Sequence, residues 1–187
     1  MKKTLFVAIL IACFTLNSYA QDDNDSKQSN LAIKAGYTSF IAKVKVDGAS
    51  GSDNVSGFYV GLTSEIEVSD KFDFQPELLF ANYSQDGESS SILFLPLLMK
   101  FNANNELGIY AGPQLDYLLN EEDAEGLNRL GIGLSIGASY DISEDIFIDT
   151  RYTFGISDRL DGDLVGFEGF DVKTRFNFFQ VGLGYRF

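Results

Sequence analysis

The sequence predicts an all-β fold, a closed eight-stranded antiparallel up-and-down transmembrane β-barrel. Three observations favour this fold class. Apolar and polar residues alternate with a period of two through most of the chain after residue 30, as in strands with two unlike faces. Short links alternate with longer polar loops between these runs, which is typical of outer-membrane barrels. The first twenty residues have the layout of an export signal.

Composition restricts the possible functions. The chain has 187 residues, enough for one domain of ordinary size, and carries 14 Lys and Arg against 27 Asp and Glu, a formal net charge of −13. This balance argues against a nucleic-acid partner, which needs clustered positive charge. The chain contains no histidine, which excludes Ser-His-Asp and Cys-His triads and His-ligated zinc. The single cysteine, Cys13, excludes an intrachain disulfide.

The N-terminus is predicted to be a signal peptide over residues 1–20. Lys2 and Lys3 precede an apolar run, and residues 18–20 offer a small-x-small cleavage site ending at Ala20. The apolar run is too short to span a bilayer stably. A lipobox ending at Cys13 is the alternative, although the apolar run continues past this cysteine. Residues 21–30 are then a short polar leader, expected to be disordered, and residues 31–187 form the barrel domain.

Eight runs with a period of two follow the leader. In the clearest run, residues 130–142, large apolar residues alternate with Gly, Ser and Asp, a division that no helical period produces. The predicted strands lie near residues 31–40, 56–68, 72–84, 91–101, 107–119, 130–142, 146–157 and 173–187.

The connections between these runs alternate in length. Short links are expected at residues 69–71, 102–106 and 143–145, and longer loops rich in Gly, Ser and acids at residues 41–55, 85–90, 120–129 and 158–172. In outer-membrane barrels the short turns lie on the periplasmic side, where both termini of an even-stranded barrel also lie. The long loops are therefore predicted to be extracellular.

The volume of the two faces predicts which one meets lipid. The bulky set includes nine aromatic residues and would overfill an eight-stranded interior, which is only wide enough for its own side chains. Its members are Phe58, Phe72, Phe74, Phe80, Tyr152, Phe154, Phe179, Tyr185 and Phe187. We expect this set to face lipid and the small polar set to leave a cramped hydrophilic lumen. A soluble lipocalin-like binding barrel, with the two faces reversed, is the alternative.

Three prolines fall inside predicted strands. Pro76, Pro96 and Pro113 each remove a donor from the hydrogen-bond ladder, so bulges or bends are expected at these positions.

Two groups of residues carry a resemblance to known proteins. Gln180, Gly182, Tyr185 and Phe187 match the C-terminal signal recognised by the barrel-assembly machinery of outer membranes. The phrases at residues 75–78, 95–101 and 111–113 resemble those of the PorT-type outer-membrane β-barrel family, and the general build is similar to small OmpX/OmpA-like barrels. The resemblance implies a fold and the outer membrane of a Gram-negative bacterium, without implying an activity.

Seven ionisable residues fall on the predicted inner face. They are Lys34, Glu65, Glu77, Lys100, Asp116, Asp149 and Arg151. Because burying an isolated charge is prohibitive, we expect them to pair with one another as a structural network. Glu77 and Arg151 lie at similar heights on opposite strands, which predicts that they bridge and plug the lumen. A functional gate or buried acid pair is the alternative.

The loop acids are weaker candidates for a site. Glu121, Glu122, Asp123 and Glu125 could hold Ca²⁺ or Mg²⁺, but they do not follow the spacing of a calcium loop. A solvated acidic loop is the favoured interpretation here, as it is for Asp158, Asp161 and Asp163, which belong to a loop that is a plausible binding surface by position. The aromatics Phe167, Phe170, Phe176 and Phe178 near that loop could contact a partner or pack on the rim. No cofactor is predicted.

The function predicted from these features is a structural or interaction role through the extracellular loops, without porin or enzyme activity. A His-free enzyme acting on envelope lipid or glycan is the alternative, since two carboxylates can hydrolyse glycosides. The expected partners are outer-membrane lipid, the barrel-assembly machinery during biogenesis and an envelope protein bound by the loops.

Overall fold

The structure, a computed structural model, describes residues 29–46, 49–85, 87–120, 127–160 and 172–187. The predicted signal peptide and nearly all of the polar leader lie outside these residues. The described strands are β1 (Ser29–Val46), β2 (Ala49–Ser69), β3 (Phe72–Gln85), β4 (Glu88–Asn102), β5 (Leu107–Leu118), β6 (Leu130–Asp141), β7 (Ile146–Gly155) and β8 (Val172–Arg186). Within the described ranges, no helix has the length and hydropathy needed to cross a membrane.

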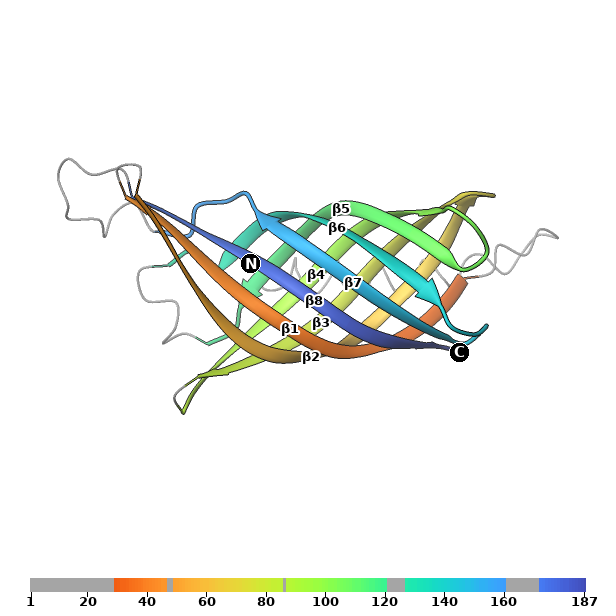
Figure 1. Ribbon diagram of the computed structural model, residues 1–187, viewed down its shortest axis with the longest axis horizontal. Helices are drawn as coiled ribbons and strands as arrows, with labels where there is room; N and C mark the ends of the chain where they lie inside the picture. The colour runs from red at the N-terminus through yellow and green to blue at the C-terminus, as the bar shows by residue number, and fades with distance from the viewer. Residues whose placement is uncertain (1–28, 47–48, 86, 121–126, 161–171) are drawn as a thin grey trace, which may run out of the picture.

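The eight strands form one closed antiparallel barrel in which each strand pairs with its sequence neighbours. β1 and β8 close the ring, with Ile33 opposite Tyr185 and Val46 opposite Val172. Closure leaves no unpaired sheet edge in the barrel wall, as hydrocarbon requires. Figure 1 shows the strands crossing the barrel obliquely, with the C-terminus and the short turns at one end. The predicted fold class is therefore confirmed.

The bulky residues lie on the outer wall, as the volume argument predicts. None of the nine aromatics named for this face is buried, and Phe58, Phe154 and Phe187 are among the most exposed. The inner face of the same strands carries the glycines. An added Cβ at Gly184 would lie 2.1 Å from the ring of Phe147, which points into the lumen, so glycine leaves the space that this ring fills. The lipocalin-like alternative, with aromatics inside and acids outside, is wrong.

The lumen itself differs from the prediction in its extracellular half. There a cluster of buried, mostly apolar side chains fills the barrel: Tyr59, Leu79, Ala81, Tyr83, Ile92, Phe94, Leu118, Phe176 and Phe178, with Phe40 packed against them. The rings meet edge to face, with centroids 4.7 Å apart for Phe94 and Phe178 and for Phe40 and Phe176. The main ion networks lie in the periplasmic half. The prediction was wrong for the other half because it weighed the outer aromatics and overlooked those that alternation places inside.

Two of the predicted long loops are mostly strand. β1 and β2 continue in register from Ser39 opposite Ser56 to Val46 opposite Ala49, and β3 and β4 continue to Gln85 opposite Glu88. Gly87 has a φ of 90°, a left-handed conformation that suits glycine in such a tight turn. The Gly- and Ser-rich composition predicted loops here, whereas pairing with neighbouring strands holds both segments extended. In Figure 1, β1, β2 and β8 extend together beyond the other strands at the left.

The prolines interrupt the ladder without a bulge. Pro76, Pro96 and Pro113 each pair with a residue of one neighbouring strand, and the pairing lapses on the other side and then resumes in the same register. The missing N–H explains the interruption. The register shift that the structure shows lies between Glu67 and Ser69. The expectation of bulges at the prolines is therefore wrong.

Candidate functional site

Four charged side chains from three strands meet inside the periplasmic half of the lumen. Lys34 of β1 contacts Glu77 of β3 at 3.1 Å and Asp149 of β7 at 2.9 Å, both from Nζ to a carboxylate oxygen. Nη2 of Arg151, also on β7, lies 2.7 Å from Oε2 of Glu77 and 3.8 Å from Oδ2 of Asp149. All four side chains are almost fully buried, so each charge relies on its partners rather than on water. The Glu77–Arg151 contact spans the lumen.

Neutral side chains complete this network. The hydroxyl of Tyr110 donates to Asp149 at 2.8 Å, and the Tyr59 hydroxyl is 3.4 Å from the other oxygen of that carboxylate. The Gln75 amide donates to Glu77 at 2.6 Å. These donors occupy carboxylate lone pairs that the two cations leave open, which is what makes a buried ion network tolerable.

A second set of ion pairs lies at the periplasmic end. Lys100 contacts Glu65 at 2.8 Å, and Arg186 lies 3.5 Å from the other oxygen of Glu65. Arg186 also contacts Asp141 at 2.7 Å and stacks over Phe147, 4.5 Å from the ring centroid. These ion pairs link β2, β4, β6 and β8 on the inner wall, on the periplasmic side of the central network.

At the extracellular mouth, Arg159 lies over the aromatic cluster. It forms an ion pair with Asp116, its guanidinium lies 4.7 Å from the ring centroid of Phe176, and it donates to the backbone carbonyl of Asn128 at 3.0 Å. Burial lowers the pKa of Arg159 to about 10, which still leaves it charged at neutral pH. The contacts of Arg159 connect the segment after β7 with the segment before β6.

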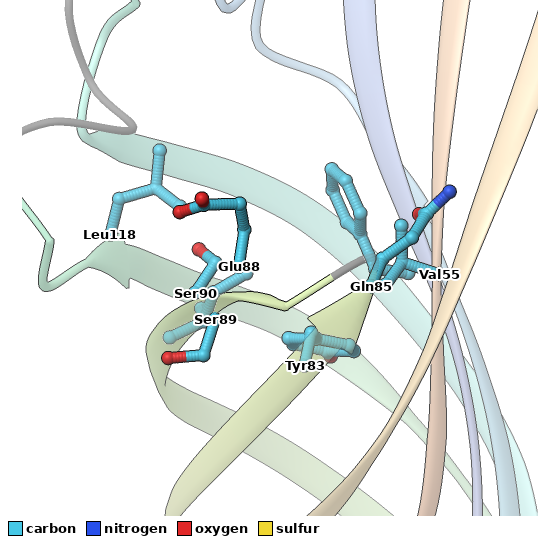
Figure 2. Close-up of a pocket in the computed structure, with 9 residues that line it drawn as sticks. Val55, Tyr83, Gln85, Glu88, Ser89, Ser90 and Leu118 are labelled. Carbon is cyan, nitrogen blue, oxygen red and sulfur yellow. The ribbon is translucent and has the colours of Figure 1, made fainter.

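A pocket of about 140 Å³ opens beside this mouth. Phe40, Tyr83, Ile92 and other apolar residues form its floor, while Glu88 and two serines line the polar side. Figure 2 shows Glu88, Ser89, Ser90 and Leu118 on one side of it, and Val55 and Gln85 on the other. Of its lining residues, Tyr83, Ile92 and Leu118 belong to the aromatic cluster, and Phe40 packs against it.

The structure thus brings the seven ionisable residues predicted inside into three groups. Lys34, Glu77, Asp149 and Arg151 form the central network, Glu65 and Lys100 belong to the periplasmic set, and Asp116 binds Arg159.

Of the assembly-signal residues, Gln180 and Gly182 lie on the inner face of β8, while Tyr185 and Phe187 are exposed on the outer wall. Their rings are 5.6 Å apart.

The predicted loop sites are described only in part. The acids at residues 121–125, together with Asp161, Asp163, Phe167 and Phe170, lie outside the described residues. Asp158 accepts hydrogen bonds from the backbone amides of Leu160 and Thr174 and so acts as a local cap. Phe176 and Phe178 are buried in the aromatic cluster and do not form a rim surface. In the described ranges, no three metal-ligating side chains lie close enough together to hold a metal ion.

Several interior partners were missed by the sequence analysis. Tyr110 and Gln75 share the inward phase with the charged residues of β5 and β3, so alternation could have found them. Arg159 lies beyond the last residue of β7, where no alternating pattern applies, and only the fold reveals its position.

A family described as "Outer membrane protein beta-barrel domain" matches residues 6–187, which is nearly the whole chain. The chain belongs to this family. It is therefore a small outer-membrane β-barrel protein of a Gram-negative bacterium, with lipid around its outer wall.

Solved structures agree with the fold. The chain is similar to Ail, the attachment invasion locus protein of Yersinia pestis, at 16% identity and a TM-score of 0.53, over 86% of this chain and 99% of that one. It is similar to Neisserial surface protein A at 14% identity and a TM-score of 0.51, with the same two coverages. Both likenesses concern the fold alone. No curated protein matches the sequence significantly.

Proposed function

We propose that this protein is a non-conducting outer-membrane barrel that binds an envelope protein through a sheet edge on its extracellular side. The observation that carries the proposal is a three-stranded extension, here called the arm, made of residues 39–46 of β1, 49–56 of β2 and 172–177 of β8. Within it, the described pairing joins β2 to β1 alone, because the pairing of β2 with β3 starts at Gly57. An extended segment of a partner can add to such an open edge as a further strand.

The chemistry of the edge supports this role. The backbone N–H of Asn54 donates to the Asp53 carboxylate at 2.8 Å, so it is directed away from the ladder with β1 and onto the open edge. Residues 51–54 are all exposed, and none of them is a large apolar residue. Such a polar edge can be exposed to water without causing aggregation, and its backbone groups can pair with a partner strand.

The filled lumen supports the absence of porin activity. Ion networks occupy its periplasmic half and aromatic rings its extracellular half. Catalysis is disfavoured for a related reason. Glu77 and Asp149, the acids that could act on lipid or glycan, are 2% exposed and ion-paired, whereas a general acid or base must reach its substrate.

We also propose that the chain is a PorT-type member of its family. The proline-containing phrases around Pro76, Pro96 and Pro113 support a PorT-type member. The exposed aromatic residues Tyr185 and Phe187 at the end of β8 support recognition by the barrel-assembly machinery during biogenesis.

The test is site-specific photo-crosslinking in intact cells. A crosslinking residue in place of Asn54 is expected to give one protein adduct of discrete mass, and the same residue in place of Glu67, near the periplasmic end of β2, is expected to give none. With the crosslinker at Ser52, the additional change Asn54→Pro is expected to abolish the adduct, because it removes the backbone N–H that bonds to Asp53 and is directed away from β1. The matched change Asn54→Ala should retain the adduct.

Equal adducts from both ends of β2, or an adduct that survives Asn54→Pro in a barrel that still shifts its mobility on heating, would contradict strand addition at this edge.

A further inference from the structure

The pocket at the extracellular mouth lies where β2 and β3 separate. The described ladder between these strands ends at the pair of Gly57 and Tyr83. Two residues further out, Val55 and Gln85 would form the next pair on the same face of a continued ladder, and instead both line the pocket. Figure 2 shows them on one side of it, with Glu88 of β4 on the other. The pocket therefore opens directly beside the open edge of the arm.

A strand added antiparallel to this edge would place one side chain in the pocket. Because the N–H of Asn54 is directed onto the open edge, Asn54 and the partner residue opposite it would exchange backbone hydrogen bonds. The preceding residue of the partner would then lie opposite Val55 in a non-hydrogen-bonded pair, where the Cα atoms are only about 4.5 Å apart. Residues opposite each other in a ladder share one face of the sheet, and for Val55 this face lines the pocket.

The pocket fits a large apolar side chain. Phe40, Tyr83, Ile92 and Leu118 line it, and each of them belongs to the aromatic cluster or packs against it. Its volume is about 140 Å³. A cavity of about 150 Å³ with a lining of Leu, Ile and Phe holds a benzene ring. One ring, or one branched aliphatic side chain, would therefore fill the pocket.

Two acids flank the position that such a side chain would occupy. Glu88 lines the pocket, and Asp53 lies two residues from Val55 on the same face of β2, with both acids exposed. On strand addition a partner carbonyl would replace the Asp53 carboxylate as acceptor of the Asn54 N–H, which leaves this carboxylate for the partner residue opposite it. An opposite charge there would stabilise the cross-strand pair. The edge therefore favours a cation two residues after the apolar side chain.

We propose that the pocket selects the partner strand that adds to the arm, and that this strand carries Phe or Leu followed two positions later by Lys or Arg. The inference rests on the proposed function, because the open edge of β2 supplies the backbone contacts and the pocket supplies the choice of side chain.

The test measures binding of fluorescent peptides to the refolded full chain in phosphatidylcholine nanodiscs by fluorescence anisotropy. The probe is a seven-residue threonine peptide with phenylalanine at its third position and lysine at its fifth, and the matched peptide has serine in place of phenylalanine. The phenylalanine peptide is expected to bind at least about tenfold more tightly, because its ring is buried. Glutamine in place of its lysine should weaken binding about threefold, and equal affinity would overturn the choice of a cation.

Variants of the barrel separate the pocket from the edge. Ser90→Phe fills the pocket from β4 and is expected to lower the phenylalanine peptide to the affinity of the serine peptide. The matched change Ser84→Phe adds the same ring to an exposed position on the other face of β3 and should leave both affinities unchanged. Asn54→Pro, which removes the N–H directed onto the edge, should weaken both peptides.

Four results would overturn the proposal in variants that keep the heat-dependent mobility shift. Equal binding of the two peptides, with both weakened by Asn54→Pro, would leave strand addition standing and remove the role of the pocket. A phenylalanine preference that survives Ser90→Phe would place the ring elsewhere. A preference lost in Ser90→Phe but unchanged in Asn54→Pro would mean that the pocket binds rings without strand addition, against the proposed function as well. Binding of neither peptide would contradict both.

Discussion

The two halves of the lumen are filled in different ways. The periplasmic half is filled by a buried ion network in which Lys34 and Arg151 hold Glu77 and Asp149. The extracellular half is filled by packed rings such as Phe94 and Phe178. The stability of the ion network depends on each charge having a correctly placed partner, because a buried charge without its counter-ion is costly. The ring cluster depends on volume, because a removed ring leaves a cavity. The barrel is therefore stabilised by specific charge pairs at one end and by the packing of large side chains at the other.

The largest expected effect is in the ion network. Glu77→Ala leaves Lys34 and Arg151 buried with one carboxylate between them, and we expect a loss of about 3–5 kcal/mol in the free energy of unfolding. Urea titration in micelles, followed by the heat-dependent mobility shift, measures it. The matched control is Glu67→Ala, which removes an exposed acid of β2.

Removing the charges together sharpens this prediction. The quadruple variant K34M/E77Q/D149N/R151M should be more stable than Glu77→Ala alone, because no charge is left without a partner. A quadruple variant that is less stable would show that the ion pairs themselves, and not the avoidance of an unpaired charge, stabilise this half.

The aromatic half should respond to volume. Phe178→Ala removes a ring that is 1% exposed, and we expect a loss of about 3 kcal/mol, at the lower end of the usual range because the cluster borders an open pocket that can collapse. Phe178→Leu keeps most of the volume and should cost less than about 1.5 kcal/mol. The same urea titration measures both variants. If Phe178→Leu lowers the free energy of unfolding as much as Phe178→Ala does, the cluster depends on ring geometry and not on volume, and it does not differ from the ion network in the way described.

A smaller effect is expected where glycine makes room for a ring. Gly184→Ala directs a Cβ into the Phe147 ring, at a cost of about 1–3 kcal/mol. In a double-mutant cycle with Phe147→Ala, the pair should be less destabilising than the sum of the single changes by about 0.5–3 kcal/mol. Strict additivity would mean that the barrel wall shifts to accommodate the methyl group and that the glycine is not needed for packing.

The sequence predicted the fold because its strongest signal, the period of two, directly encodes which face meets lipid. The same signal placed Lys34, Glu77, Asp149 and Arg151 on one face, although it could not give their contacts, which depend on register and tilt. The arm was missed because the Gly, Ser and Asp residues of its β2 part are typical of loops, and only their pairing with β1 makes them strand.

The aromatic layer was missed for another reason. Phe176 and Phe178 lie in the inward phase of the last strand, but a volume estimate for the whole barrel does not distinguish its two ends. Arg159 could not be found at all, because it lies beyond the end of β7, outside any alternating pattern, and its partner Asp116 is distant in the chain.

The ion network and the aromatic cluster together close the lumen. The most direct test is the ion current through the purified, refolded protein in a planar lipid bilayer. The structure predicts no steady channel conductance, because the Glu77–Arg151 bridge and the aromatic cluster lie in series along the axis. A large, steady, single-channel current from the wild-type barrel would contradict it.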